Sequence, residues 1–199
     1  MSSPCEDAGV FVFVLPVKSL DTGKSRLQAA PRDRAELIRA MLLDTLDAVL
    51  ECDLGPVVVV SPDSEVKDLA ARNGARAMHH GGSLNEAVAA ASEGPTAAIL
   101  PDLPAVRADD IRAVLTGAPK GYVADWSGTG TTMLFGQTVV PHFGPDSARK
   151  HESAGYPRIT GAARALTADV DTREDLERAR GLGLGPRTAA WLDRMARTA

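Results

Sequence analysis

The chain has 199 residues, an ordinary length for one α/β domain, and with 44% hydrophobic but only 4% aromatic residues its core is expected to consist mainly of Ala, Val, Leu and Ile. A formal net charge of −4 argues against nucleic acid as a partner, although nucleotides, which need only a few local cations, are not excluded. Two cysteines without metal-ligand spacing, no visible secretory signal and no apolar run of membrane-spanning length predict a soluble, cytoplasmic protein with no membrane association.

The chain begins with a polar segment, residues 1–9, that reads as a flexible leader. Residues 10–15 form a continuous β-branched and aromatic run that is too apolar for an exposed strand, so a central strand is predicted there. Apolar residues at helical spacing predict a long helix over residues 33–50. Further strands are expected at residues 57–60, 75–79, 97–100, 121–125, 132–135 and 168–171, and further helices at 62–72, 84–91, 108–115, 172–179 and 186–197, with loop and helix mixed over 142–155.

Strand and helix alternate through the first two-thirds of the chain, and the strands are continuous apolar runs. This pattern is typical of a three-layer α/β/α fold with a mostly parallel sheet. No internal repeat or low-complexity linker divides the chain, so residues 1–199 are expected to form one domain. Because ligands of open α/β sheets bind at the carboxyl ends of the strands, the polar segments that follow strands should meet in one crevice.

A basic loop, residues 18–26, follows the first expected strand. Lys18, Lys24 and Arg26 can surround the phosphates of a nucleotide, and Gly23 lets the backbone approach them. The spacing is not that of a P-loop, and no Gly-x-Gly-x-x-Gly fingerprint follows the strand. A solvated surface loop remains the alternative.

Three aspartates at other strand ends are candidate metal ligands. Asp102 lies between two prolines at the tip of an apolar strand, where it could hold Mg²⁺ against phosphate oxygens, or it could be a helix-capping or turn residue. Asp169 and Asp171, two positions apart on an expected strand, would share one face and supply a second ligand. In the alternative, Asp171 caps the next helix and Asp169 lies on the surface.

Two segments offer groups for an anionic substrate. Residues 128–132 form a Gly/Thr loop, which could bind a phosphate or carboxylate or could be a hairpin turn. Ser147 would open a short helix with donors at its N-terminus, and His151 would share its face or lie at an interface. No nucleophile elbow or third partner accompanies Ser147 and His151, so a nucleophile pair is not indicated.

Together these segments resemble the guanylyltransferases that make the activated three-carbon phospho-acid intermediate of deazaflavin coenzyme F-420 biosynthesis. The resemblance covers about residues 11–180 and rests on the order of its motifs. They are Pro16-Val-Lys18 with Lys24-Ser25-Arg26-Leu27, Leu84-Asn85, Asp102-Leu103-Pro104, Gly128-Thr-Gly-Thr131, Phe143-Gly144-x-x-Ser147-x-x-x-His151 and Asp169-Val-Asp-Thr172.

The resemblance implies a Rossmann-like nucleotide-diphospho-sugar transferase fold, GTP as co-substrate and Mg²⁺ as cofactor. It also implies that Lys18, Lys24 and Arg26 hold the GTP phosphates, that Asp102 binds Mg²⁺ and that Asn85 lies near the nucleoside. The acid substrate would be contacted by Thr131, Gly144 and Ser147, and His151 would help to orient it. In members of actinobacterial type that substrate is phosphoenolpyruvate, and in archaeal members it is 2-phospho-L-lactate.

The alternatives are a nucleotidyltransferase that acts on 2-phospho-L-lactate, a sugar phosphate or another cofactor precursor, and a non-catalytic nucleotide-binding protein on the same fold. Asp102 favours a transferase, because a binding module has no need of a metal ligand at a strand tip. A handover of the product to a downstream transferase, and either a monomer or a homodimer, remain open.

Overall fold

A six-stranded mixed sheet forms the centre of the protein. The computed structural model describes residues 10–198 except 19, 21–23, 25–26 and 28–29, so the expected leader lies outside the described residues. The strands are β1 (Val12–Pro16), β2 (Val57–Val60), β3 (Arg76–Met78), β4 (Thr96–Ile99), β5 (Gly121–Ala124) and β6 (Thr131–Gly136), in the order β3-β2-β1-β4-β6-β5. β6 runs antiparallel to β4 and β5, whereas β1 to β4 pair in parallel, which confirms the predicted mostly parallel sheet.

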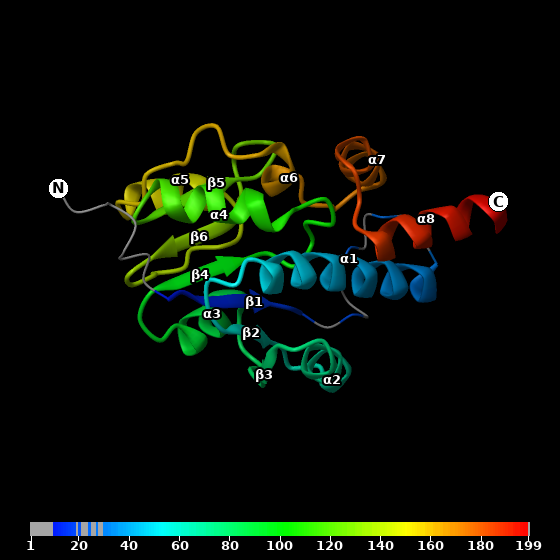
Figure 1. Ribbon diagram of the computed structural model, residues 1–199, viewed down its shortest axis with the longest axis horizontal. Coiled ribbons are helices and arrows are strands. Elements are labelled where there is room, and N and C mark those ends of the chain that lie inside the picture. The colour runs from blue at the N-terminus through cyan, green and yellow to red at the C-terminus, as the bar shows by residue number, and fades with distance from the viewer. Residues whose placement is uncertain (1–9, 19, 21–23, 25–26, 28–29, 199) are drawn as a thin grey trace.

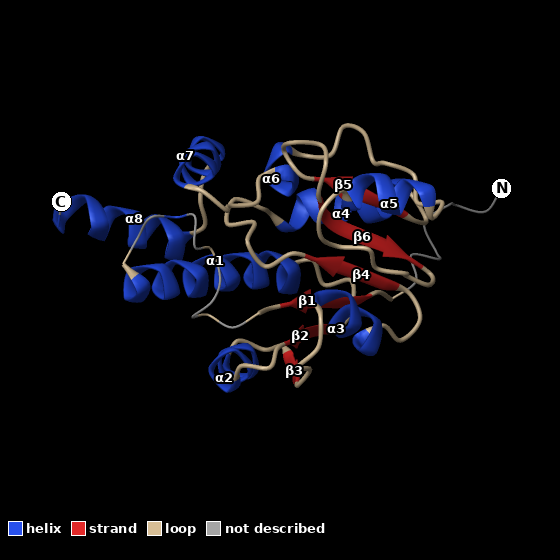
Figure 2. Cartoon of the chain, turned by 180° about the vertical axis from the view of Figure 1, so that it is seen from behind, coloured by secondary structure: helices blue, strands red, loops and turns tan. Residues whose placement is uncertain are grey.

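Helices cover both faces of this sheet (Figures 1 and 2). They are α1 (Pro31–Glu51), α2 (Ser64–Arg72), α3 (Leu84–Ala91), α4 (Ala108–Gly117), α5 (Ser147–Ser153), α6 (Arg164–Thr167), α7 (Arg173–Leu182) and α8 (Pro186–Thr198). Local sequence sets several of their ends: a proline opens α1, Ser83 and Glu86 form a capping box at α3, and Thr172 and Asp175 form another at α7.

The alternation of side chains along the strands builds one core on each face. Phe13 and Leu15 of β1 point toward α1, α4 and α6, and Val14 points to the opposite face, where α3 and α5 lie. Figure 1 shows α1 and α4 in front of the sheet, and Figure 2 shows α3 and α5 in front of it from behind. A third cluster joins α1 to α7 and α8. The three-layer α/β/α arrangement is therefore confirmed.

The expected strand over residues 168–171 is wrong. This segment has no regular structure; it is anchored where the amide of Val170 donates to the carbonyl of Asp102 over 3.1 Å. Val170 is fully buried among side chains of α1, α7 and α8, which explains why its surroundings read as an apolar strand. The four-residue helix α6 just before it was not predicted, because so short an element carries little periodic signal.

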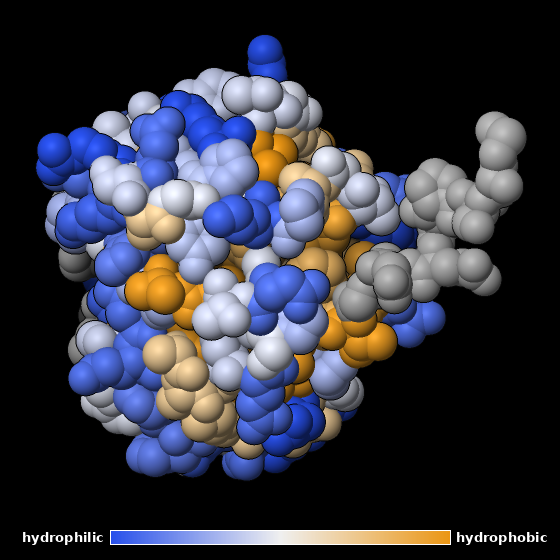
Figure 3. All heavy atoms as spheres, turned by 90° about the vertical axis from the view of Figure 1, so that its left-hand side faces the viewer, coloured by the Kyte–Doolittle hydropathy of each residue, from blue (hydrophilic) through white to orange (hydrophobic). Residues whose placement is uncertain are grey.

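The edge of the sheet that carries the amino ends of the parallel strands faces the viewer in Figure 3. Hydrophilic residues cover most of this face, with separate hydrophobic areas between them. None of the described helices is long and apolar enough to cross a bilayer. The candidate site residues lie at the other edge.

A buried carboxylate fastens α8 to α1. Asp44, in α1 and only 5% exposed, accepts hydrogen bonds from the amides of Arg187 (3.1 Å) and Thr188 (2.8 Å), which are otherwise unpaired donors in the first turn of α8. We expect Asp44→Ala to lower the free energy of unfolding by about 2–4 kcal/mol, because it leaves these amides without acceptors. Asp47→Ala is the matched control, since it removes only a partly exposed ion pair with Arg187 and should cost about 1 kcal/mol or less. Equal losses in urea unfolding would contradict this assignment.

Candidate active site

A hollow of about 300 Å³ opens at the carboxyl ends of β1 and β4. Its polar lining comes from Lys18, Lys24, Asp102 and Asp171, and its apolar lining from Pro16, Val17, Ile38, Met41, Leu42, Leu84, Leu100 and Pro101. A second hollow shares Pro16, Val17, Lys18 and Leu84 with the first and continues toward His80, Gly82 and Ser83. Lys18 and Lys24 of the basic loop therefore meet the strand-tip Asp102 in one crevice, as expected from their positions after strands.

Lys24 is the centre of the charged groups in this crevice. Its ammonium group donates to Asp102 Oδ2 and, over 2.5 Å, to Asp171 Oδ1. Burial alone would lower the pKa of Lys24, but the charges of Asp102 and Asp171 outweigh it and hold the pKa above its usual value. Lys24 also adopts a positive φ of 56°, a backbone conformation that few non-glycine residues take and that is often found at functional sites.

The carboxylates around Lys24 carry more negative charge than the lysine neutralises. Asp102 Oδ1 is buried and makes no hydrogen bond in the described part of the chain. Burial, and then the charge of Asp102, raise the pKa of Asp169 to about 7, an effect that Lys24 reduces but does not cancel. An unpartnered buried carboxylate oxygen beside a carboxylate of raised pKa fits a hard divalent cation, which prefers oxygen ligands.

No three acidic, histidine or cysteine side chains already converge as a metal site among the described residues. The ammonium of Lys24 holds the position between Asp102 and Asp171. Asp102, through its unpartnered Oδ1, and Asp169 are the better-placed candidate ligands, whereas the side chain of Asp171 is 50% exposed and bonded to Lys24.

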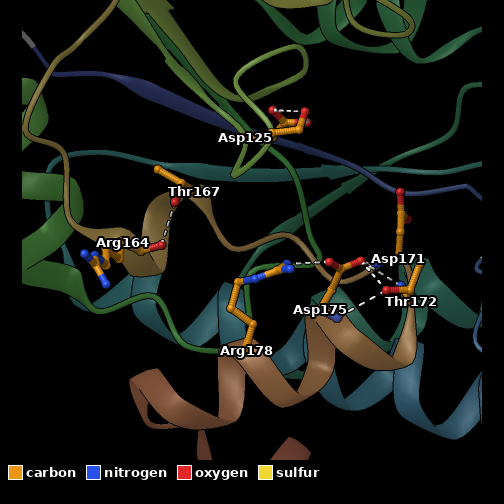
Figure 4. A network of polar contacts seen from close by, with 8 residues as sticks. Asp125, Arg164, Thr167, Asp171, Thr172, Asp175 and Arg178 are labelled. Atoms are coloured by element: carbon orange, nitrogen blue, oxygen red, sulfur yellow. Dashed lines mark hydrogen bonds and ion pairs between the residues drawn. The ribbon is translucent and has the colours of Figure 1, made fainter.

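The start of α7 positions Asp171. Asp175 accepts hydrogen bonds from the amides of Asp171 (3.2 Å) and Thr172 (2.9 Å), and Arg178 donates to its other oxygen over 2.6 Å. Figure 4 shows the carboxylate of Asp171 pointing away from Asp175. Thr172 is the helix cap, so the capping role that sequence also allowed for Asp171 is wrong, and its carboxylate is free to bind Lys24.

Lys18 lies two residues beyond the end of β1, is exposed, and lines both hollows. Gly23 and Arg26 lie outside the described residues, so their predicted phosphate contacts remain predictions. Asn85 lies in α3, but both ends of its side-chain amide are bonded to the backbone of Phe143, over 3.1 and 2.7 Å. This contact ties α3 to the segment before Gly144; a nucleoside contact by Asn85 remains a prediction.

The candidate acid-binding residues lie near the start of β6 and the start of α5. Thr131 begins β6 beside the end of β4, and the amide of Ala148 in α5 donates to the carbonyl of Thr129 over 3.0 Å. The amide of Ser147 is bonded to the carbonyl of Gly144, so the helix N-terminus has fewer free donors than expected. Ser147 is buried, and its hydroxyl makes no hydrogen bond with a described residue.

Asp125 organises the Gly/Thr loop, a role that the sequence reasoning missed. The carboxylate of Asp125 (Figure 4) accepts from the amide of Thr129 (3.0 Å) and the hydroxyl of Ser127 (2.9 Å). Its charge contributes to the raised pKa of Asp169. The sequence contained a signal for this role, because Asp125 ends an expected strand just as Asp102 does. The loop also joins two antiparallel neighbours, so the hairpin interpretation of residues 128–132 is correct for its topology.

His151 is fully buried beneath this loop. Its ring is surrounded by those of Tyr122, His142, Phe143 and Tyr156, at centroid distances of 5.3–6.1 Å. Burial, and then the nearby His142, lower the pKa of His151 to about 4 from its ordinary 6.5. The ring is therefore neutral at physiological pH.

This pKa makes the stability depend on pH. Between pH 6.5 and 4 the unfolded chain binds a proton at His151 that the folded chain does not, so the free energy of unfolding falls as the pH falls. We expect His151 to contribute a loss of about 2 kcal/mol between pH 7 and pH 5. Urea unfolding at both pH values should show a smaller loss for His151→Gln than for the wild type. His79→Gln, at an exposed histidine, should leave the loss unchanged; if both variants behave alike, the neutral buried ring is disproved.

Comparison with known proteins identifies the family of this chain. The model of the family "Guanylyl transferase CofC like" matches residues 11–142. A protein of Nocardia farcinica named phosphoenolpyruvate guanylyltransferase is 43% identical over 201 residues, covering 90% of this chain and 89% of that protein. A protein of the same name from Mycolicibacterium smegmatis is 38% identical, covering 91% and 90%. A solved nucleotidyl transferase from Methanothermobacter thermautotroptrophicus has a TM-score of 0.60 at 17% identity, covering 87% of this chain and 97% of that one.

The chain shares the fold of this solved nucleotidyl transferase, and its crevice lies at the carboxyl ends of the strands. The family model and the curated relatives narrow the assignment further. The chain belongs to the CofC-like guanylyltransferase family and is a guanylyltransferase.

Proposed function

We propose that the chain transfers GMP from GTP to phosphoenolpyruvate, giving enolpyruvyl-diphospho-guanosine and diphosphate, as a step in coenzyme F-420 biosynthesis. The observation that carries the proposal is the crevice in which Lys18, Lys24, Asp102 and Asp171 meet, in a chain 43% identical to a phosphoenolpyruvate guanylyltransferase. Cations beside a carboxylate with one unpartnered oxygen suit a reaction between two phosphate groups, where positioning and charge neutralisation are the main sources of rate.

In this reaction a phosphate oxygen of phosphoenolpyruvate attacks the α-phosphorus of GTP. The bond between the α-phosphorus and the bridging oxygen breaks, and diphosphate leaves with that oxygen. The attacking phosphate is already ionised at neutral pH, so no general base is required. This agrees with the burial of His151 and with the lack of a catalytic pair between it and Ser147.

Each candidate residue has a role in the proposed reaction. Lys18 and Lys24, with Arg26, neutralise the phosphates of GTP, and Thr131, Gly144 and Ser147 orient the acid. Asp102 and Asp169, assisted by Asp171, would hold Mg²⁺, which supplies positive charge to phosphate oxygens when bound. Lys24 is bonded to Asp102 and Asp171, so a contact between its ammonium group and the phosphates of GTP would replace part of this pairing.

Diphosphate release tests the proposal directly. The purified chain is incubated with GTP and Mg²⁺, and phosphoenolpyruvate, 2-phospho-L-lactate and a sugar phosphate are offered separately, with the downstream transferase present to trap a labile product. Release that requires phosphoenolpyruvate is the expected result. Release with 2-phospho-L-lactate or a sugar phosphate alone would move the assignment to that substrate, and no release with any phospho-acid would disprove the proposal.

A further inference from the structure

The two ring nitrogens of His151 have different partners. The backbone amide of His142 donates to Nε2 over 2.9 Å, and a peptide N–H can act only as a donor. Nε2 therefore carries no proton, the ring is neutral, and its single proton lies on Nδ1. Nδ1 is 2.9 Å from Thr131 Oγ1, so His151 donates to the hydroxyl oxygen of Thr131.

This direction of donation decides what Thr131 can offer a ligand. The oxygen of the hydroxyl already accepts a proton from His151, and its own O–H has no acceptor among the described residues. A hydroxyl in this state presents a donor to any neighbouring anion. The burial that keeps the imidazole neutral also maintains this state over the physiological pH range.

We propose that His151 is a positioning residue that fixes the hydroxyl of Thr131 as a hydrogen-bond donor toward the acidic substrate. The inference rests on the proposed function, in which Thr131 contacts the phospho-acid. His151 has no exposed surface and Thr131 is 3% exposed, so His151 acts through Thr131 and does not touch the substrate.

The same ring links the two segments that would hold the acid. Through the amide of His142 it fixes the residues just before Gly144, and through Thr131 it fixes the start of β6. Asn85 completes this attachment by binding both backbone groups of Phe143. A substrate group that only accepts hydrogen bonds, such as a carboxylate or phosphate, matches the donors of Thr131 and Ser147. A neutral amide or alcohol at that position would match them less well.

The tautomer can be observed without turnover. The chain has four histidines, and ¹⁵N labelling of their rings, with His151→Gln used for assignment, gives the protonation of each nitrogen by NMR. We expect His151 to show a protonated Nδ1 and an unprotonated Nε2 from pH 6 to pH 8. A protonated Nε2, or a ring that becomes charged within this range, would overturn the inference.

Kinetics test whether His151 acts through Thr131. We expect His151→Gln and Thr131→Val each to raise KM for phosphoenolpyruvate about tenfold, with KM for GTP unchanged, because each removes one oriented hydrogen bond. The double variant should be no worse than Thr131→Val alone, and Thr131→Ser, which keeps the hydroxyl, should stay near wild type. Multiplying effects in the double variant, or an equal rise in KM for GTP, would show a general structural role and overturn the inference.

The two proposals fail in different ways. If wild-type chain turns over no phospho-acid, the proposed function is lost, and the NMR result alone decides whether Thr131 is held as a donor. If phosphoenolpyruvate is turned over but the single variants leave its KM unchanged, the positioning role is disproved and the proposed function stands.

Discussion

Asp102→Asn is expected to lower kcat/KM for GTP-dependent diphosphate release by about 10²–10³-fold, the range seen when one preorganised electrostatic contact is removed. The amide keeps the size of the side chain but loses the charge that attracts both Lys24 and a divalent cation. The buried Oδ1 of Asp102, which has no partner in the described part of the chain, is the oxygen whose loss matters most to a cation. The rate of diphosphate release over a range of GTP concentrations, repeated at several Mg²⁺ concentrations, measures the effect.

Asp109→Asn is the matched control for this prediction. Asp109 lies in the first turn of α4, its side chain is 91% exposed, and its ion pair with Arg112 is of the surface kind that contributes little. Its kinetics should be those of the wild type. Asp171→Asn should fall between the two, because that carboxylate is half-exposed. If Asp102→Asn keeps its activity within threefold of the wild type, Asp102 is not a metal ligand.

The fold was predictable because its strands carry a strong local signal. The four valines of β2 are buried on both faces, and β1 is nearly as apolar, so a run of apolar residues bounded by turn residues marked each strand. The capping boxes at Ser83 and Thr172 likewise mark helix starts within a few residues. The strand predicted around Val170 was wrong, because Val170 is buried by tertiary packing and does not pair with a neighbouring strand.

The sequence predicted where in the fold the site residues lie, but not which of them contact one another. Sequence could place Lys24, Asp102 and Asp171 at one edge of a sheet, because each was expected at or after a strand end. It could not show that Lys24 binds both carboxylates, since these contacts span 78 and 147 residues along the chain. Nor could it show that His151 is buried against Thr131, because four-residue helical spacing from Ser147 says nothing of which face is covered.

Lys24→Met should separate two roles of the same ammonium group. Turnover is expected to fall by about 10²–10³-fold, because a neutral side chain of similar length cannot neutralise the phosphates of GTP. Binding of Mn²⁺ to the ligand-free chain, used as a probe of the carboxylates, is expected to tighten several-fold, because Lys24 no longer competes with the metal for Asp102 and Asp171. Most single substitutions that disturb an active site weaken both properties, so opposite changes are diagnostic.

Lys18→Met is the control, because Lys18 lines the same hollow, is exposed, and makes no ion pair with a described residue. It should raise KM for GTP and leave Mn²⁺ binding unchanged. Isothermal titration with Mn²⁺ and diphosphate release, with circular dichroism to verify folding, measure all three chains. Removing Lys24 also leaves Asp102, Asp169 and Asp171 without their cation, so Lys24→Met should gain stability from Mn²⁺ more than the wild type does. Weaker Mn²⁺ binding by Lys24→Met would mean that the lysine organises the carboxylates for the metal instead of competing with it.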